Sequence, residues 1–240
     1  MASTAAGRQL TERHRLSQVR VAAAVVAQIR QLFGLLGPDT LADNSPAFVD
    51  AAVTLIAHQH GVSVALARGY YRTFRAVEAG AGATAILPTP GLDLDRVRTS
   101  LAVTGPIKIK QGMAAGRTFE RASLSALTAA AGAASRHVLG GGRDMLTGAI
   151  RSDRRALGYA RATSGRPCAF CALLAGRGPT FSDEASAGFQ AHDACACVPE
   201  PVYRADAPFP GERFAALYQE QTAGSSDPLN AFRRAYEAAG

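Results

Sequence analysis

The clustering of the cysteines constrains this chain more than any other feature of its sequence. All four cysteines of the 240 residues, and one of the five histidines, lie between positions 168 and 197. Two thiolates separated by two residues can chelate one ion, and a second pair from a distant segment completes a tetrahedron. The spacing therefore predicts a zinc site, and its candidate ligands are Cys168, Cys171, His192, Cys195 and Cys197.

Five candidates compete for the four positions of a tetrahedral zinc ion. We expect Cys168, Cys171 and His192 to bind it together with either Cys195 or Cys197. A site made of all four cysteines, with His192 free, is the alternative. Because four protein ligands leave no open position for water, we expect one structural Zn²⁺ that helps a small module to fold.

Two other interpretations of the cysteines compete with the zinc site. Four buried free thiols would act as small apolar side chains. A redox Cys-x-x-Cys pair would need a thioredoxin-like βαβ context, which the sequence lacks. A chain kept in a reducing cytoplasm holds its cysteines as thiols or metal ligands rather than disulfides.

The composition predicts a mainly α protein. Fifty residues are alanine, which has the highest helix propensity, whereas aromatic residues make up only 7% and tryptophan is absent. We divide the chain into a helical domain at 1–156, a small α+β Cys/His zinc-binding module at 157–204 and a helical tail at 205–240. Short strands are expected at Tyr159–Thr163 and Val198–Tyr203, on either side of the cysteines.

Glycine and proline mark where the expected helices begin and end. An amphipathic stripe predicts a helix over 16–36, and Ser45 with Pro46 is typical of a second helix start. We expect Gly61 to interrupt that helix and the triple glycine 140–142 to form a turn. The other expected elements are a loop at 80–90, a short helix after Asp93 that ends at Gly105-Pro106, helices over 112–137 and 143–155, and tail helices near Phe214 and after Asp227.

A basic stretch flanks the cysteine cluster. The formal net charge of the chain is +7, and 24 of its 26 basic residues are arginines. Arg151, Arg154 and Arg155 end the last helix of the first domain, and Arg161 and Arg166 lead into the zinc module. These five residues can form one patch for a polyanion or a protein partner. The alternative is an ordinary solvated basic face.

No segment predicts a membrane protein. The longest apolar stretch, Val21 to Ile29, is too short to span a bilayer, and the first residues lack the apolar core of a secretory signal. We therefore expect no membrane partner and a chain that is made and kept in a cytoplasm.

Around the cysteines the sequence resembles a known family. Three segments carry the resemblance: Tyr159-Ala-Arg161, the run from Gly165 to Pro179, and His192-Asp-Ala-Cys195-Ala-Cys197. They are similar to the core of phage Mu F-like minor head proteins, especially the branch from tailed phages and prophages of actinobacteria. Alanine at positions 194 and 196 departs from the polar residues expected there.

The resemblance implies a minor capsid protein that acts in head morphogenesis near the portal. Its implied partners are portal, capsid or scaffold proteins, with packaged DNA as a further candidate for the basic patch. Its implied location is the virion or procapsid, and the bacterial host cytoplasm during assembly.

Two enzymatic alternatives remain at this point. Some relatives in this gene neighbourhood are described as capsid maturation proteases, but the sequence contains no Gly-x-Ser-x-Gly and no His-Glu-x-x-His. The second alternative is a nuclease, or a nucleic-acid-binding protein, whose small module is held together by a structural zinc ion. Such a nuclease would need a histidine that is not a metal ligand, and His192 is the only histidine of the module. We therefore expect no catalytic residues, with nucleic-acid binding as a further alternative.

Overall fold

The chain folds into long helices, a two-stranded sheet and a cluster of short helices, in a computed structural model that describes residues 2–80, 91–179, 189, 191–207 and 209–239. In chain order the elements are α1 (Ala5–Leu32), η1 (Phe33–Leu35), α2 (Leu41–Ala79), α3 (Leu94–Ala102), η2 (Val103–Ile107), α4 (Lys108–Ala114), α5 (Phe119–Ser152), β1 (Gly158–Ala162), α6 (Ala169–Gly176), β2 (Val198–Val202), α7 (Glu212–Thr222) and α8 (Pro228–Ala238). The mainly α prediction is confirmed. Among the described residues no helix is both long and apolar enough to cross a membrane.

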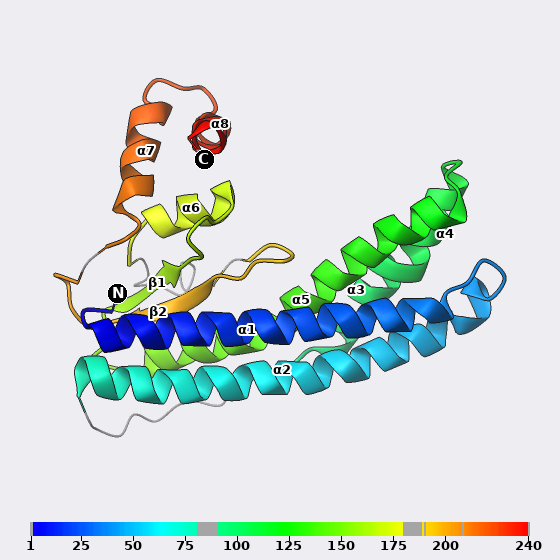
Figure 1. Ribbon diagram of the computed structural model, residues 1–240, viewed down its shortest axis with the longest axis horizontal. Coiled ribbons are helices and arrows are strands. Elements are labelled where there is room, and N and C mark those ends of the chain that lie inside the picture. The colour runs from blue at the N-terminus through cyan, green and yellow to red at the C-terminus, as the bar shows by residue number, and fades with distance from the viewer. Residues whose placement is uncertain (1, 81–90, 180–188, 190, 208, 240) are drawn as a thin grey trace.

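Helices α1, α2 and α5 form the body of the molecule and pack along one another (Figure 1). The Thr4 side chain caps α1 by accepting a hydrogen bond from the Gly7 N–H, and Thr118 caps α5 in the same way through Arg121. Because apolar side chains recur at helical spacing, each helix buries one stripe. The largest core cluster comprises Val21, Val25, Ile29, Phe33, Leu36, Leu41, Phe48, Val49, Ala52, Val53, Ile56, Val97, Leu101, Ile109, Ala122, Ala126, Ala130, Ala134, Val138 and Leu139.

Two predicted breaks in these helices are wrong. Gly61 lies inside α2, and the triple glycine 140–142 lies inside α5. A Cβ at Gly142 would come within 2.7 Å of Ser63 Oγ, and one at Gly141 within 2.7 Å of the His60 ring. These two glycines therefore allow α1 and α2 to approach α5 closely, which a sequence scan for turn residues does not detect.

Other predicted boundaries also differ from the structure. Helix α2 begins at Leu41, so Pro46 lies within it rather than at its first position. The predicted helix over 112–137 is two helices, because the chain turns at Gly116 with a positive φ of 78°. The break at Gly105-Pro106 is a π-helical turn in which Gly105 has non-helical angles. Except for Gly80, the loop predicted at 80–90 lies outside the described residues.

The two predicted strands form one antiparallel ribbon. Gly158 of β1 pairs with Val202 of β2, and Ala162 pairs with Val198. Every residue of both strands is buried. Helices α6, α7 and α8 then pack on one another at the end of the molecule that holds the start of α1 (Figure 1). Asp227 caps α8 ahead of Pro228, as the sequence predicts.

A buried carboxylate joins this ribbon to the long helices. Asp153, 4% exposed at the end of α5, accepts hydrogen bonds from Arg75 Nε at 2.8 Å, Tyr71 Oη at 2.9 Å and Tyr203 Oη at 3.1 Å. Buried Glu200 of β2 also accepts a hydrogen bond from the backbone N–H of Ala2, at 2.8 Å. The ribbon is therefore held against α1, α2 and α5 by polar as well as apolar contacts.

Candidate metal centre

The five candidate ligands come from two segments that the fold brings together. Cys168 is the N-cap of α6, and its Sγ accepts a hydrogen bond from the Cys171 N–H. Cys171 lies in the first turn of α6, whereas His192, Cys195 and Cys197 precede β2. A cysteine at the N-cap leaves its thiol at the helix terminus. Both thiols of the Cys-x-x-Cys pair lie close to the segment before β2, with Cys168 Sγ near His192 and Cys171 Sγ near Cys195.

The ligand atoms of the five side chains form two groups that share one thiol. Cys168, Cys171 and His192 have their ligand atoms within 4.8 Å of one another, and so do Cys171, Cys195 and Cys197. The Cys171 Sγ lies 3.5 Å from Cys195 Sγ and 3.7 Å from His192 Nε2. Tetrahedral zinc with bonds of about 2.3 Å to sulfur separates its ligand atoms by about 3.8 Å. The cluster therefore has the donor atoms and the spacing to hold a metal ion.

His192 presents one ring nitrogen to the thiols. Its Nδ1 lies 2.6 Å from the Asp193 carbonyl oxygen, which can only accept, so Nδ1 carries the proton. Its Nε2 lies 2.9 Å from Cys168 Sγ. A metal-binding histidine commonly donates its second ring N–H to a carbonyl in this way, because the hydrogen bond fixes the tautomer and the ring orientation.

Helix α5 holds the segment that contains His192, Cys195 and Cys197. Arg136 Nε is 2.7 Å from Asp193 Oδ1, and a Cβ at Gly132 would lie 2.9 Å from the Asp193 Cβ. Arg143 is 4% exposed and donates to the Cys195 carbonyl at 2.5 Å and to the Cys197 carbonyl at 3.2 Å. These contacts fix the backbone of the second ligand segment from one face of α5.

Two buried arginines supply positive charge to the thiols. Arg161 of β1 is 7% exposed, and its Nη1 lies 3.9 Å from Cys171 Sγ. Its guanidinium stacks on Phe189 at 3.8 Å, and Arg143 approaches the same ring at 5.4 Å. Because a thiolate–metal centre is anionic, buried guanidinium groups beside it offset charge that would otherwise be costly to bury.

The thiols differ in acidity because they share protons. Hydrogen bonds from Cys171 and Cys197 hold the pKa of Cys195 far below its usual value, and the charge of Arg143 adds to this effect. The pKa of Cys171 is raised, chiefly by its hydrogen bond to Cys195. At the exposed edge the pKa of Cys168 is lowered: burial opposes this, but hydrogen bonds from Cys171 and His192 prevail. The cluster therefore favours a thiolate, the form that binds metal.

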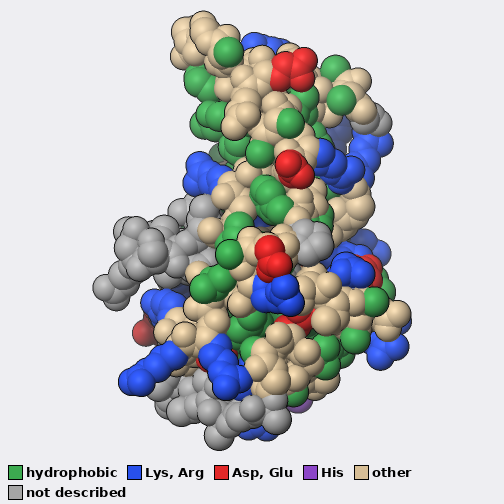
Figure 2. All heavy atoms as spheres, turned by 90° about the vertical axis from the view of Figure 1, so that its left-hand side faces the viewer, with side chains coloured by type: hydrophobic (Ala, Val, Ile, Leu, Met, Phe, Trp, Pro, Cys, Tyr) green, Lys and Arg blue, Asp and Glu red, His purple; other side chains and the backbone are tan. Residues whose placement is uncertain are grey.

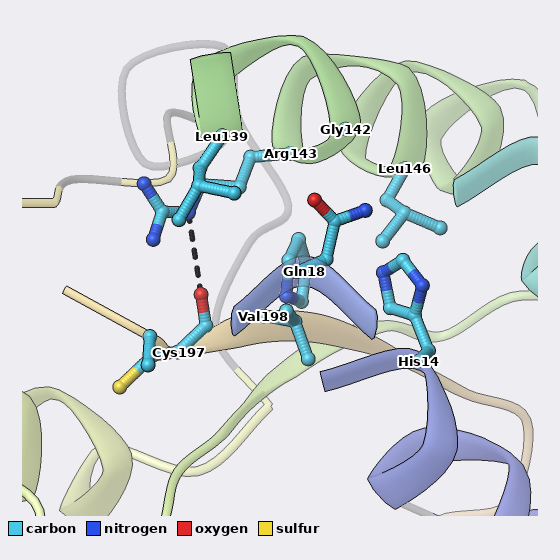
Figure 3. Close-up of a pocket in the computed structure, with 10 residues that line it drawn as sticks. His14, Gln18, Leu139, Gly142, Arg143, Leu146, Cys197 and Val198 are labelled. Carbon is cyan, nitrogen blue, oxygen red and sulfur yellow. Dashed lines mark hydrogen bonds between the residues drawn. The ribbon is translucent and has the colours of Figure 1, made fainter. Parts of the chain in front are cut away.

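The small cavity between α1, α5 and β2 is a packing gap rather than a substrate pocket (Figure 3). Its volume is about 10 Å³, which is the size of one water molecule. In Figure 3 the Arg143 side chain reaches from α5 toward the Cys197 carbonyl, while His14 and Gln18 extend from α1. The sequence did not reveal this structural role of Arg143, because nothing in its local sequence marks the side chain as buried.

The five arginines proposed as a patch do not share one environment. Arg151, Arg154, Arg155 and Arg166 are exposed, whereas Arg161 is buried against the cysteines. Arg155 also donates to the Ala79 carbonyl at 2.6 Å. The inclusion of Arg161 in an exposed patch is therefore wrong, because the side chain of this inward-facing β1 residue fills space beside Cys171. Figure 2 views the end of the molecule where α1 begins and shows basic side chains in several separate groups.

Comparison with known proteins identifies a family. No curated protein and no solved structure matches the chain. The family model described as VG15 protein matches residues 5–223, which include both strands and the whole Cys/His cluster. The chain therefore belongs to the VG15 protein family, a family of phage gene products.

Proposed function

We propose that this chain is a minor capsid protein of a tailed phage or prophage, and that a structural zinc ion stabilises its C-terminal part. The observation that carries the proposal is the five-residue Cys/His cluster within a member of a phage protein family. The similarity of residues 159–197 to Mu F-like minor head proteins supports the more specific assignment to head morphogenesis near the portal.

Zinc fits the donor set better than other common metals. Thiolate and imidazole ligands in a tetrahedral arrangement favour Zn²⁺, whereas Mg²⁺ and Ca²⁺ prefer oxygen ligands. The ligands proposed are Cys168, Cys171, His192 and Cys195. His192 is included because its Nε2 faces the thiols while its Nδ1 already donates to the Asp193 carbonyl. Cys195 is included because its Sγ lies 3.5 Å from Cys171 Sγ. Cys197 remains the alternative fourth ligand, since it lies in the same group as Cys171 and Cys195.

Elemental analysis of the protein purified without added metal tests the zinc site. We expect about one zinc per chain, and a Co²⁺-substituted protein should show the visible absorption of tetrahedral thiolate ligation. Cys195→Ser and Cys197→Ser, compared side by side, identify the fourth ligand, because only the ligand variant should lose metal. Far less than one equivalent of any metal in the unmodified chain would contradict the proposal.

Mass spectrometry of purified virions and procapsids tests the role in the head. We expect the intact chain in both particles, at low copy number relative to the major capsid protein. Its absence from procapsids and virions that package DNA normally would contradict the assignment.

A triple variant of Arg151, Arg154 and Arg155 to Glu tests whether these exposed residues recruit the chain to portal, capsid or scaffold proteins. We expect reduced incorporation of the variant into procapsids, with normal folding.

A second candidate function, a cysteine peptidase of capsid maturation, is favoured by one contact. Cys168 is exposed at the start of α6, and its Sγ lies 2.9 Å from His192 Nε2, as in a thiol–imidazole catalytic pair. The peptidase candidate requires Cys168 to be alkylated rapidly by iodoacetamide and its alanine variant to abolish cleavage of a capsid protein. The zinc proposal expects alkylation of Cys168 and Cys171 only after a chelator removes the metal.

A further inference from the structure

A charged groove lies between the C-terminal helices and the loop that leads from β1 to α6. Its volume is about 450 Å³, within the usual range of about 300–1,000 Å³ for ligand pockets. The residues that line it are Gly165, Arg166, Arg213, Phe214, Leu217, Tyr236 and Ala239. They come from the β1–α6 loop, α7 and α8, so the groove is formed where these three segments meet.

The groove combines an apolar wall with two guanidinium groups. Arg213 Nη2 donates to the Gly165 carbonyl at 3.2 Å, and the guanidinium lies 4.5 Å above the Phe214 ring. Arg213 is thus held across the groove, with further N–H groups that can bind a ligand. Arg166 is exposed and makes no hydrogen bond or ion pair with the described residues. No carboxylate belongs to the described lining of the groove.

Contacts among α7, α8 and the β1–α6 loop hold the apolar wall in place. Phe214 is 6% exposed and packs edge-on against Tyr236, with 5.8 Å between the ring centroids. The Tyr236 hydroxyl donates to the Pro167 carbonyl at 2.6 Å, so it joins α8 to the β1–α6 loop. A phenolic oxygen that donates its proton in this way can still accept a hydrogen bond. The wall is therefore preorganised, which lowers the entropic cost of binding.

We infer that this groove binds an acidic peptide segment of a partner protein. Carboxylates of the segment would pair with Arg166 and Arg213, since guanidinium groups bind carboxylates through parallel N–H donors. An apolar side chain between the carboxylates would contact Leu217 and Tyr236. Nucleic acid fits less well, because affinity for it depends on neutralising many phosphates, whereas this groove offers two cations beside an apolar wall.

The inference goes beyond the proposed function, because none of the five candidate metal ligands lines the groove. A charge reversal in the groove should therefore leave the zinc content unchanged. A failed zinc site and a failed peptide site can be told apart in the same samples.

Fluorescence anisotropy with a labelled peptide tests the inference. The probe is a six-residue amidated peptide of alternating glutamate and leucine, and the comparison probes are its glutamine analogue and a thymidine oligonucleotide of equal charge. We expect the acidic peptide to bind the full chain at least tenfold more tightly than either comparison probe. The double variant Arg166→Glu and Arg213→Glu should weaken its binding at least tenfold, with unchanged circular dichroism and zinc content.

The matched control changes the same net charge elsewhere. Arg20→Glu with Arg30→Glu alters two exposed residues of α1 that do not line the groove. We expect this variant to bind the acidic peptide within twofold of the unmodified chain. Equal losses in both double variants, equal binding of the glutamine analogue, or preference for the oligonucleotide would each overturn the inference.

Discussion

Two regions of the molecule are stabilised by different means: the α1–α2–α5 bundle, and the Cys/His segment that contains Cys168, Cys171, His192, Cys195 and Cys197. The bundle buries a continuous cluster of aliphatic and aromatic side chains along its length. The core cluster at the candidate metal centre has only Cys171, Cys195 and Cys197 as its buried members among the described residues, with Phe189 and Ala191 packed against them. Burial of apolar area is non-directional and scales with the area removed from water, so many side chains share the stabilisation of the bundle. The Cys/His segment is held by contacts from α5, and we propose that it depends on metal ligation as well.

Removing the proposed metal ion should produce the largest difference in stability between the two regions. The variant Cys171→Ser removes the thiol that belongs to both ligand groups. Because structural zinc contributes on the order of 10 kcal/mol to the folding of small domains, we expect β1, α6 and β2 to lose protection from hydrogen exchange. The part of the bundle around Phe48 should keep its protection.

Chelation of the unmodified chain is the control, and it should reproduce the exchange pattern of the variant. Loss of protection throughout α2 in either sample would show that the two regions fold as one unit. Unchanged protection in β1 and β2 without metal would show that contacts with the bundle hold these strands by themselves.

Replacing Asp153 tests the polar junction between the regions. Asp153→Asn removes the charged carboxylate that pairs with the buried Arg75 guanidinium, and we expect a loss of about 3–5 kcal/mol in unfolding free energy, measured with urea. The control is Asp206→Asn, which breaks a pair with Arg204 whose side chains are 58% and 71% exposed. The control should cost less than about 1 kcal/mol. Equal losses in the two variants would remove Asp153 from its role as a junction.

Acidification should weaken the junction of α1 with α2 through His14. This residue is 5% exposed and stacked on Tyr70, and burial lowers its pKa to about 4. A folded-state pKa below the unfolded value of about 6.5 means that stability is complete above pH 6.5 and falls as the pH drops toward 4. We expect a loss of about 2 kcal/mol between pH 7 and pH 5.

The variant His14→Gln isolates this contribution. Urea unfolding of the variant at pH 7 and at pH 5 should show a smaller difference than the unmodified chain. An identical pH dependence in the two proteins would assign the effect to other groups.

The triple glycine offers a matched pair within one helix. Gly142→Ala places a Cβ within 3.1 Å of the Ser63 carbonyl, so we expect a loss of about 1–3 kcal/mol from overpacking between α5 and α2. A Cβ at Gly140 would meet no neighbouring atom within 4 Å among the described residues. Gly140→Ala should therefore stabilise the helix by about 0.5–1 kcal/mol. Thermal unfolding of both variants checks the opposite signs, and equal signs would contradict the close approach.

The smallest expected effect concerns Ala194, between two candidate ligands. It has a φ of 60°, a left-handed conformation that costs a residue with a Cβ about 1–2 kcal/mol. Ala194→Gly should stabilise the Cys/His segment by about 0.5–1 kcal/mol after the greater flexibility of glycine is counted. Ala196→Gly, changed at the neighbouring alanine, is the control and should not stabilise. The measurement is the chelator concentration that half-removes the metal at fixed protein concentration.

The sequence predicted those features that depend on residues close together along the chain. The Asp93 and Asp227 caps, the two strands and the proximity of the cysteines follow from hydrogen-bonding capacity, strand composition and ligand spacing. Glycine misled the prediction at positions 61 and 140–142, because a glycine that ends a helix and one that lies inside a helix look alike in sequence. Only the packing of α5 against the other helices shows that Gly141 and Gly142 lie at a close approach.

The sequence by itself determined the helical class and the grouping of five possible metal ligands, since propensity and spacing are properties of neighbouring residues. The tertiary structure alone decided which arginines are exposed and which are buried. Arg143 and Arg161 lie beside the cysteines because α5 and β1 converge there, whereas Arg151, Arg154 and Arg166 face solvent. A charged side chain is buried where partners from distant segments offset its desolvation, and such partners are known only once the chain has folded.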